Sequence, residues 1–420
     1  MTRCSWTFDF RHFAVLLAST LGCGVPSAPA RAADACVQHP AEVAARMPTA
    51  TMMTGVLPAE LTARLDAAAR ASLKEASTPG LIVGVRTPAG TWTSAYGKAD
   101  PDKDTPMKVG MNTRIGSLTK TFIGTMIMQL DESGALSLDD RIEKHVPGVP
   151  NGEKISLRQL ANMTSGVASY TRNSRFTEVY FRKPETIFRP EQLLAIGLAD
   201  SPSFAPGARF DYSNTNTVLL GMVIEKVTRR TIAENLKLMV FEPLNLKNTS
   251  WPGESADMPA PYAQGFTLQG DAKDGKSLNA THWNPAWGWT AGELISNMDD
   301  LLVYGRALGT GQGLLRPESQ VARLTSFPVP AGYGIAMGCS GGWVGHTGEL
   351  PGYNSTLFYD TQTDTTVAVQ TNSDIASGNC KEDPLLPSDP RKAVCSSPAV
   401  RIFVALSTAL GRTFTPPPRE

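Results

Sequence analysis

The sequence predicts an α/β (α+β) protein in which both ends of the chain build one antiparallel sheet and the middle forms a helical lobe. Short β-rich runs occur within residues 80–96 and again within residues 333–370, whereas helical spacing of apolar residues dominates residues 118–308. Strands joined by short turns pair antiparallel, so the two groups most simply form a single sheet. Terminal helices would cover that sheet, and a cleft is expected where it meets the helical lobe.

The composition is that of a globular chain with balanced charge. Of the 420 residues 41% are hydrophobic and 7% aromatic, and 39 Lys and Arg residues balance 39 Asp and Glu residues. This hydrophobic fraction is sufficient for a sizeable core. Because no long run of like charge occurs, neither nucleic acid nor an anionic membrane surface is expected as a partner.

The first 32 residues have the pattern of a secretory signal peptide. Basic residues precede an apolar stretch over residues 13–25, and Ala30 and Ala32 are the small residues that a signal peptidase reads. The apolar stretch is shorter than the roughly 20 residues that a spanning helix needs. The mature protein is therefore expected to be periplasmic or secreted without an integral membrane segment. A lipoprotein signal acylated at Cys23 is the weaker alternative.

The N-terminal part is expected to supply an extension, a helix and a hairpin, over residues 33–57, 58–76 and 80–96. Leu61 and Leu65 recur at helical spacing after Pro58, which suits a first helical turn. Two β-rich runs, residues 80–87 and 91–96, flank a turn that contains proline and glycine.

The middle of the chain is expected to be helical, and the C-terminal part to return to strands. Apolar residues recur at helical spacing in residues 118–130, 157–163, 191–198, 218–227, 232–239 and 298–308. β-rich runs follow at residues 333–337, 343–346, 355–359 and 365–370. A closing helix over residues 399–410 precedes a proline-rich tail. The predicted domain spans residues 58–414, with a sheet lobe at 58–115 and 325–414 and a helical lobe at 116–324.

Four of the six cysteines remain after the signal peptide: Cys36, Cys339, Cys380 and Cys395. An even number in an exported chain is compatible with two disulfides in any of three pairings. We favour Cys380 with Cys395, because they bracket a proline-rich segment that a crosslink would hold in place, which leaves Cys36 with Cys339. The five histidines lack ligand spacing, so neither a metal nor an organic cofactor is expected.

The segment Ser117-Leu118-Thr119-Lys120, at the start of a predicted helix, is the first of three motifs that could carry chemistry. Residues three apart share a helix face, so Lys120 can reach the Ser117 hydroxyl. A serine hydroxyl is a weak nucleophile without a base, and a desolvated lysine loses basicity until it can serve as one. Free N–H groups at the helix start would stabilise an oxyanion. A single Ser-x-x-Lys is nevertheless common by chance.

The other two motifs lie before a helix and at the end of a strand. In Tyr212-Ser213-Asn214, a phenol beside a cationic lysine would have a lowered pKa and relay protons, and the amide could bind Lys120 and a substrate carbonyl. His346-Thr347-Gly348 ends a strand along which a substrate could lie, because the glycine has no side chain to block it. The N–H of Glu349 could complete an oxyanion hole. Each motif alone is equally typical of a helix cap or an ordinary strand end.

Together the three motifs resemble those of the serine β-lactamase and DD-peptidase superfamily, specifically its class C-like branch. Residues 114–120, 212–216 and 345–348 look most like secreted D-alanyl-D-alanine carboxypeptidases, and the likeness extends over about residues 61–410. The resemblance implies a five-stranded antiparallel sheet packed by N- and C-terminal helices, an all-helical lobe, and an active site between them. It also implies acyl-enzyme chemistry on a small peptide or β-lactam. We expect a monomer.

The resemblance assigns roles residue by residue. Ser117 would be the acylated nucleophile, Lys120 and Tyr212 the coupled base and acid, and Asn214 a contact of both Lys120 and the substrate. His346 and Thr347 would meet the carboxylate end of the substrate, and the N–H groups of Ser117 and Glu349 would hold the oxyanion. Tyr170 and Trp287 would wall the cleft, unless they are ordinary loop or core aromatics.

Two departures from the family pattern bear on the substrate. His346 stands where class C β-lactamases usually have lysine, which leaves a weaker, pH-dependent positive charge. Glu349 follows the glycine where carboxypeptidases often have a small hydroxyl residue, and residues 333–342 contain no arginine to hold a terminal carboxylate. The expected function is carboxypeptidase-type trimming of peptidoglycan stem peptides. A class C-like β-lactamase, an esterase, a D-amino-acid amidase or a penicillin-binding relic that hardly deacylates remains open.

A second candidate nucleophile lies in residues 338–342, which fit the Gly-x-Ser-x-Gly elbow of α/β-hydrolases. That elbow needs a helix directly after it and a histidine well downstream. Here a strand is expected to follow, and His346 is too close in sequence. We therefore expect Ser117 rather than Ser340 to be the nucleophile.

Overall fold

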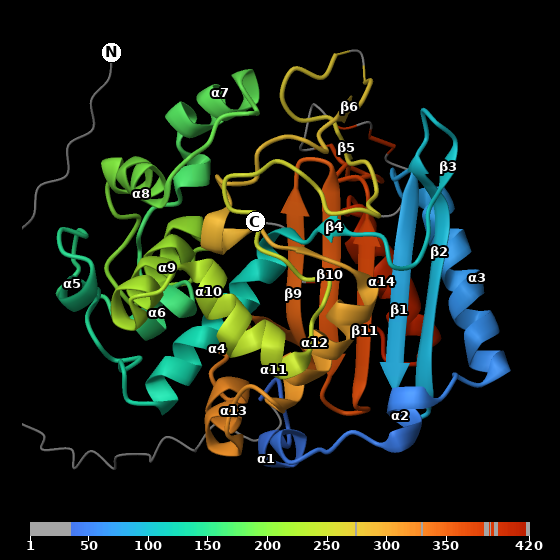
Figure 1. Ribbon diagram of the computed structural model, residues 1–420, viewed down its shortest axis with the longest axis horizontal. Helices are drawn as coiled ribbons and strands as arrows, with labels where there is room; N and C mark the ends of the chain where they lie inside the picture. Colours follow the sequence, from blue (N-terminus) through green and yellow to red (C-terminus); the bar gives the residue numbers. More distant parts are fainter. Residues whose placement is uncertain are drawn as a thin grey trace, which may run out of the picture. The chain divides into compact units, whose positions relative to one another are not determined.

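The largest element of the fold is a seven-stranded antiparallel sheet with the order β3-β2-β1-β11-β10-β9-β8 (Figure 1). The computed structural model describes residues 35–416, apart from residues 274, 329–330, 382–385, 387 and 390–393. The expected signal peptide, with Cys23, lies outside the described residues.

Five long strands form the body of the sheet, in agreement with the expected five-stranded core, and two short strands extend its edges. The long strands are β1 (Gly80–Thr87), β2 (Gly90–Asp100), β9 (Trp343–Leu350), β10 (Tyr353–Asp360) and β11 (Thr365–Thr371). The edge strands are β3 (Thr105–Pro106) and β8 (Gly338–Ser340). Strand β1 pairs with β11, with Val83 opposite Val369, so the two ends of the chain do build one sheet.

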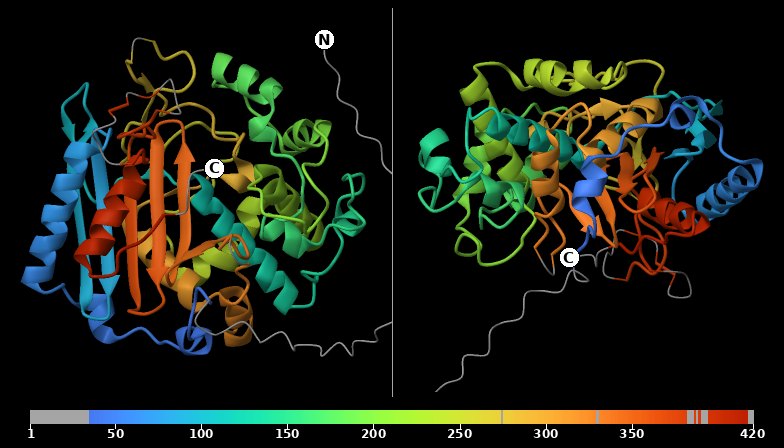
Figure 2. Two further views of the ribbon diagram at one scale, coloured as in Figure 1. Left: turned by 180° about the vertical axis from the view of Figure 1, so that it is seen from behind. Right: turned by 90° about the horizontal axis from the view of Figure 1, so that it is seen from below.

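Helices cover both faces of the sheet. The terminal helices α3 (Ala59–Glu75) and α14 (Pro398–Ala409) pack against each other on one face (Figure 2), as expected. Helix α12 (Met298–Thr310) lies on the other face, where a side chain at Gly84 would meet Met298. Burial from both sides explains why β1 is a nearly continuous apolar run instead of an alternating one.

The remaining helices form the lobe beside the sheet. They are α4 (Thr119–Glu132), α5 (Ile142–His145), α6 (Leu157–Ala161), α7 (Ser174–Arg182), α8 (Pro190–Ala199), α9 (Asn214–Thr228), α10 (Ile232–Leu236), α11 (Glu242–Leu244) and α13 (Pro317–Leu324). Helix α9 is central, since α4, α6 and α8 all pack against it. Helices α5, α7, α11 and α13 were not expected from the sequence, because each is shorter than the roughly 11 residues over which a helical period is recognised.

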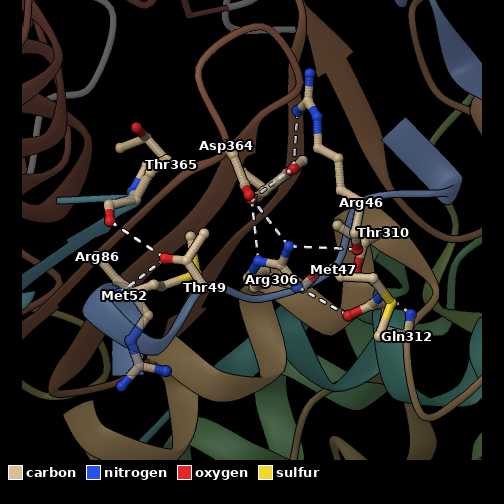
Figure 3. Close-up of polar contacts among 12 residues, drawn as sticks. Arg46, Met47, Thr49, Met52, Arg86, Arg306, Thr310, Gln312, Asp364 and Thr365 are labelled. Carbon is tan, nitrogen blue, oxygen red and sulfur yellow. Dashed lines mark hydrogen bonds and ion pairs between the residues drawn. The ribbon is translucent and has the colours of Figure 1, made fainter. Parts of the chain in front are cut away.

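The N-terminal extension is folded, although its sequence shows no periodicity. It contains α1 (Pro40–Ala44) and α2 (Ala50–Thr54), and α1 packs against α13. Arg306 of α12 donates to both carboxylate oxygens of Asp364, to the Arg46 carbonyl and to Gln312 (Figure 3). The extension is therefore held by polar contacts with residues far away in the chain, which no local pattern reveals.

Both favoured disulfides are present, Cys36–Cys339 and Cys380–Cys395. The first joins the N-terminal extension to the edge strand β8. Among the described residues, every helix is too short or too polar to cross a bilayer.

One predicted strand was wrong: residues 333–337 form a turn, and the edge strand begins at Gly338. The N–H of Gly334 donates to the carbonyl of Met337, and Ala336 has a positive φ of 51°, which breaks an extended conformation. Strand β8 then turns directly into β9, and Ser340 Oγ donates to the carbonyl of Thr415. Ser340 is thus not on a strand-to-helix elbow, in agreement with the sequence argument.

Candidate active site

Ser117 and Lys120 lie side by side where a 3₁₀ turn (Gly116–Leu118) leads into α4. Lys120 Nζ is 2.9 Å from Ser117 Oγ and donates to the carbonyl of Ala291 at 2.6 Å. Ser117 is half-buried, whereas Lys120 is fully buried beneath it. The hydroxyl can therefore meet a substrate while the amine remains shielded from water.

Burial determines the protonation state of Lys120. Desolvation holds the pKa of Lys120 well below its ordinary value. Desolvation is the cause of this shift, and no carboxylate of the described residues opposes it. Burial thus disfavours the charged ammonium, which suits Lys120 to accept the proton of Ser117.

Tyr212 completes this group just before α9. Lys120 Nζ lies 5.0 Å from the centroid of the Tyr212 ring. Within the described structure the Tyr212 hydroxyl is buried without a hydrogen bond of ordinary geometry. Burial raises the pKa of Tyr212, and the neighbouring Ser117 hydroxyl opposes this only weakly. The expectation of a lowered phenol pKa was wrong, because burial disfavours the charged phenolate, so that the Tyr212 hydroxyl keeps its proton at neutral pH.

The backbone of the nucleophile segment is in contact with strand β9. A Cβ atom on Gly348 would lie 1.9 Å from the carbonyl oxygen of Ile115, and one on Gly116 would lie 2.5 Å from the backbone nitrogen of Glu349. Ser355 of β10 donates to the same Ile115 carbonyl at 2.9 Å. Gly348 is thus required for packing of two backbones, a different reason from the open edge expected from the sequence. This packing holds the nucleophile segment against the backbone N–H of Glu349.

His346 on β9 is buried and hydrogen-bonded on both ring nitrogens. Its Nδ1 faces the Thr347 carbonyl, which only accepts, so Nδ1 carries the hydrogen, and Nε2 accepts from the Tyr333 hydroxyl at 3.0 Å. Burial, and next the neighbouring Lys120, lower the pKa of His346 to about 3. The pH-dependent positive charge expected here is therefore absent at neutral pH, because the imidazole is desolvated.

Asn214 and Tyr170 make contacts other than those expected from the sequence. Asn214 donates through its side chain to Thr171 at 3.0 Å, and the described hydrogen bonds of Lys120 do not include it. Tyr170 is fully buried and donates to the Trp287 carbonyl at 2.6 Å. Tyr170 is thus a core aromatic behind the cleft and not a wall residue.

Four of the expected site residues are at least partly accessible. Asn214, Trp287 and Thr347 are half-buried, and Glu349 is exposed. Beside the Tyr212 motif lies an open hollow of about 480 Å³. It is lined by Ala168, Ser169, Arg172, Asp200, Ser201, Ser203, Arg209, Phe210 and Asp211. Arg172 and Asp211 form a two-bonded ion pair there, at 2.8 and 2.7 Å.

Two contributions to the site were not found from the sequence. The Ala291 carbonyl holds Lys120, and the Tyr333 hydroxyl holds His346. Neither has a spacing signal, because a carbonyl is present at every residue and Tyr333 is 13 residues from His346 across a turn.

Comparisons with known proteins agree with this geometry. The family model described as Beta-lactamase matches residues 65–386. Protein flp from Staphylococcus aureus is 31% identical over 188 residues, which are 42% of this chain and only 35% of that protein. The alignment thus spans about a third of the length of that relative.

Solved structures share the fold over most of the chain. A D-stereospecific amidohydrolase from Streptomyces sp. is 32% identical, with a TM-score of 0.67, and the match covers 74% of this chain and 94% of that one. An octameric penicillin-binding protein homologue from Pyrococcus abyssi is 25% identical with a TM-score of 0.67, covering 84% of this chain and 78% of that one. Because the family match extends over most of the sequence and these structures share its sheet and helices, this protein belongs to the beta-lactamase family.

Proposed function

We propose that this protein is an exported serine hydrolase that cleaves an amide bond through an acyl-enzyme on Ser117, with a D-configured residue on the acyl side of that bond. The observation that carries the proposal is the fully buried Lys120 amine 2.9 Å from the half-buried Ser117 hydroxyl. Two disulfides are typical of an oxidising compartment and support export.

In the proposed acylation step, Ser117 Oγ attacks the substrate carbonyl carbon while Lys120 Nζ takes the hydroxyl proton. The N–H groups of Ser117 and Glu349 stabilise the resulting oxyanion. Tyr212 then donates its proton to the leaving nitrogen as the amide bond breaks, and Lys120 returns a proton to Tyr212. In deacylation a water molecule attacks the ester, its proton passes to the same pair, and Ser117 Oγ recovers a proton.

The charges around the site support a neutral leaving group. His346 is uncharged at neutral pH, burial disfavours the charged form of Lys120, and the exposed carboxylate of Glu349 follows on β9. A free carboxylate on the leaving group would find no charged histidine at position 346 and would be repelled by Glu349. The similarity to the D-stereospecific amidohydrolase from Streptomyces sp. supports amide cleavage with D-selectivity.

The second candidate is the D-alanyl-D-alanine carboxypeptidase reaction on peptidoglycan stem peptides. It is supported by the His346-Thr347-Gly348 motif and by the similarity to a penicillin-binding protein homologue. The two candidates share the acyl-serine step and differ only in whether the leaving group carries a carboxylate.

An intact-mass time course with benzylpenicillin tests the acyl-serine step. We expect a covalent adduct in the wild type and none in Ser117→Ala. Lys120→Ala and Tyr212→Phe should each slow acylation about 10² to 10⁴-fold, which is typical for loss of a general acid or base. Full hydrolytic activity of Ser117→Ala on any substrate would overturn the mechanism.

A matched substrate panel separates the two candidates. A D-aminoacyl amide, its L-enantiomer, and an acyl peptide ending in D-Ala-D-Ala are compared by kcat/KM. We expect the D-amide to be favoured over the L-amide and over the carboxylate-bearing peptide by at least about tenfold, or 1.4 kcal/mol. The reverse preference for the peptide would establish the carboxypeptidase instead. We also propose a monomer, which light scattering of the purified protein tests.

A further inference from the structure

A small cavity is lined by Arg114 and Trp287, whose side chains carry buried donors without a hydrogen bond of ordinary geometry in the described part of the chain. The space open to the centre of a water molecule is about 10 Å³, which is room for one particle of roughly the size of a water molecule. It is lined by Arg114, Tyr180, Ala280, Trp283, Pro285, Trp287, Leu350 and Pro351. The cavity thus lies between the segment before the nucleophile, the Trp287 loop and the end of β9.

Arg114 presents unsatisfied donors in this region. Its side chain is 2% exposed, and Nη2 donates to the carbonyls of Ala256 and Thr281 at 2.7 and 3.2 Å. Arg114 Nε and Nη1 are buried and have no hydrogen-bond partner among the described residues. The indole Nε1 of Trp287 is likewise buried and makes no hydrogen bond of ordinary geometry there, although the Tyr180 hydroxyl lies close to it. Buried N–H groups normally find acceptors, so three such groups around one cavity call for an acceptor inside it.

The charge of Arg114 also lacks a counterion. A guanidinium stays charged in proteins, and burying it unpaired is costly. No carboxylate of the described residues lies within 4.0 Å of it. Glu293 interacts with Arg114 at longer range, but it does not line the cavity, and burial raises its pKa well above the ordinary value, which disfavours its charged form. The exposed Asp257 interacts with Arg114 only at longer range.

We propose that this cavity binds one small monovalent anion, such as a halide, held by Arg114 and by the indole N–H of Trp287. An anion accepts from every donor and balances the guanidinium charge, whereas a water molecule would leave that charge unpaired. The bound ion would connect Arg114, three residues before Ser117, to the Trp287 loop whose carbonyl accepts from Tyr170. The site does not depend on the proposed reaction.

Thermal unfolding at constant ionic strength tests the proposal on the full-length protein. Chloride or bromide replaces gluconate, which is too large for the cavity. We expect the Tm to rise with halide concentration in the manner of a ligand that binds the folded state only. A Tm that does not respond to halide would overturn the proposal.

Two tryptophan variants test the donor. Trp287→Phe keeps an aromatic ring and removes the indole N–H. We expect the half-effect concentration, the halide concentration that gives half of the full rise in Tm, to increase about tenfold or more. The reason is that a hydrogen bond to a charged group is worth about 1.5–3 kcal/mol. Trp92→Phe makes the same change in the separate core on the other face of the sheet, and should lower the Tm without moving the half-effect concentration. An unchanged half-effect concentration in Trp287→Phe contradicts the site.

Glu293→Gln distinguishes the anion from an internal counterion. We expect this variant to keep the halide response of the wild type. If Glu293 were the counterion, the wild type would show no halide response and the variant would gain one. Anomalous scattering from a bromide-soaked crystal gives an independent test, and we expect a bromide peak between Arg114 and Trp287. A rise of the Tm with halide but without this peak would mean that the ion binds elsewhere, which would overturn the proposal.

Discussion

At the scale of single residues, burial decides the charge of the site. Desolvation favours the neutral forms of Lys120, Tyr212 and His346, because it lowers the pKa of the two bases and raises the pKa of the phenol. A neutral amine can accept the Ser117 proton, and a neutral phenol can donate one. The same desolvation removes the positive charge that a terminal carboxylate would need.

The buried His346 should make stability depend on pH. Its folded-state pKa is about 3, below the ordinary 6.5, so the unfolded state binds more protons between these values. His346 should therefore make its full contribution to the free energy of unfolding above pH 6.5. This contribution should fall as pH decreases toward 3, by up to about 1.4 kcal/mol per pH unit. Urea unfolding of the wild type and of His346→Gln at several pH values measures this contribution as the difference between their free energies of unfolding.

The exposed His282 provides the matched control for that experiment. His282→Gln should leave the slope of stability against pH unchanged. Equal slopes in the wild type and His346→Gln would contradict a neutral, desolvated His346.

Tyr333 is expected to act as a positioning residue. Tyr333→Phe removes the hydroxyl that occupies His346 Nε2 and retains the ring, which packs edge-on to His346 at a centroid distance of 5.5 Å. We expect kcat/KM to fall about tenfold, as for loss of one buried hydrogen bond. The acidic limb of the pH–rate profile should also move to higher pH, because Nε2 becomes free to bind a proton.

A packing defect alone would not move the pH profile. Phe210→Leu tests this, because the Phe210 ring packs on Tyr333 at 5.7 Å without touching the hydrogen bond. If both variants lower the rate and neither shifts the profile, Tyr333 has only a packing role.

At the scale of elements, the site depends on the close approach of the nucleophile segment to β9. Strand β9 pairs with β10 along its whole length and with β8 at residues 343–345, so β10 holds the part of β9 that contains Gly348 and Glu349. The glycines at 116 and 348 let the two backbones touch. The proposed oxyanion hole therefore depends on two elements from distant parts of the chain.

Gly348→Ala should damage this junction. The added methyl group would lie 1.9 Å from the Ile115 carbonyl oxygen, so the segment carrying Ser117 must move away from the Glu349 N–H. We expect acylation to slow about 10² to 10³-fold, as when an oxyanion donor is lost, with destabilisation of about 1–3 kcal/mol. Stopped-flow acylation and denaturant unfolding measure the two effects.

Gly338→Ala on the neighbouring strand β8 is the control, because its Cβ would have no neighbour closer than 3.7 Å. Near-normal acylation is expected in that variant. Near-normal acylation in Gly348→Ala would instead mean that the junction is not needed for the oxyanion hole.

At the scale of the whole molecule, covalent and polar contacts tie the N-terminal extension to the sheet. The Cys36–Cys339 bridge joins residues 303 positions apart, and Arg306 reaches both Asp364 and the Arg46 carbonyl. Strand β8, which carries Cys339, follows the turn that contains Tyr333. The extension therefore supports the edge of the sheet next to His346.

The two disulfides should differ in their contribution to stability. A crosslink stabilises mainly by restricting the unfolded chain, by about 3 kcal/mol for a loop of 15 residues and more for longer loops. The Cys36→Ser/Cys339→Ser variant, whose bridge spans 303 residues, should lose more stability than Cys380→Ser/Cys395→Ser, whose bridge spans 15. Guanidinium unfolding of both variants tests this order, and a smaller loss for the longer loop contradicts it.

The sequence by itself determined the features that depend on neighbours in the chain. The spacing of Ser117 and Lys120 places both on one helix face, and the apolar runs of β1, β10 and β11 define the body of the sheet. The cysteine pairing also followed from the sequence, because one pair brackets a short segment.

Only the tertiary structure decided the features that depend on burial and on contacts between distant segments. The neutral His346, the Tyr333 hydroxyl that holds it, the backbone contact at Gly348 and the unpartnered donors of Arg114 have no local pattern. The fold of residues 35–57 likewise depends on α12 and β8. The physical reason is that spacing sets which side chains share an element, whereas desolvation and close packing arise only when elements far apart in the chain enclose the same space.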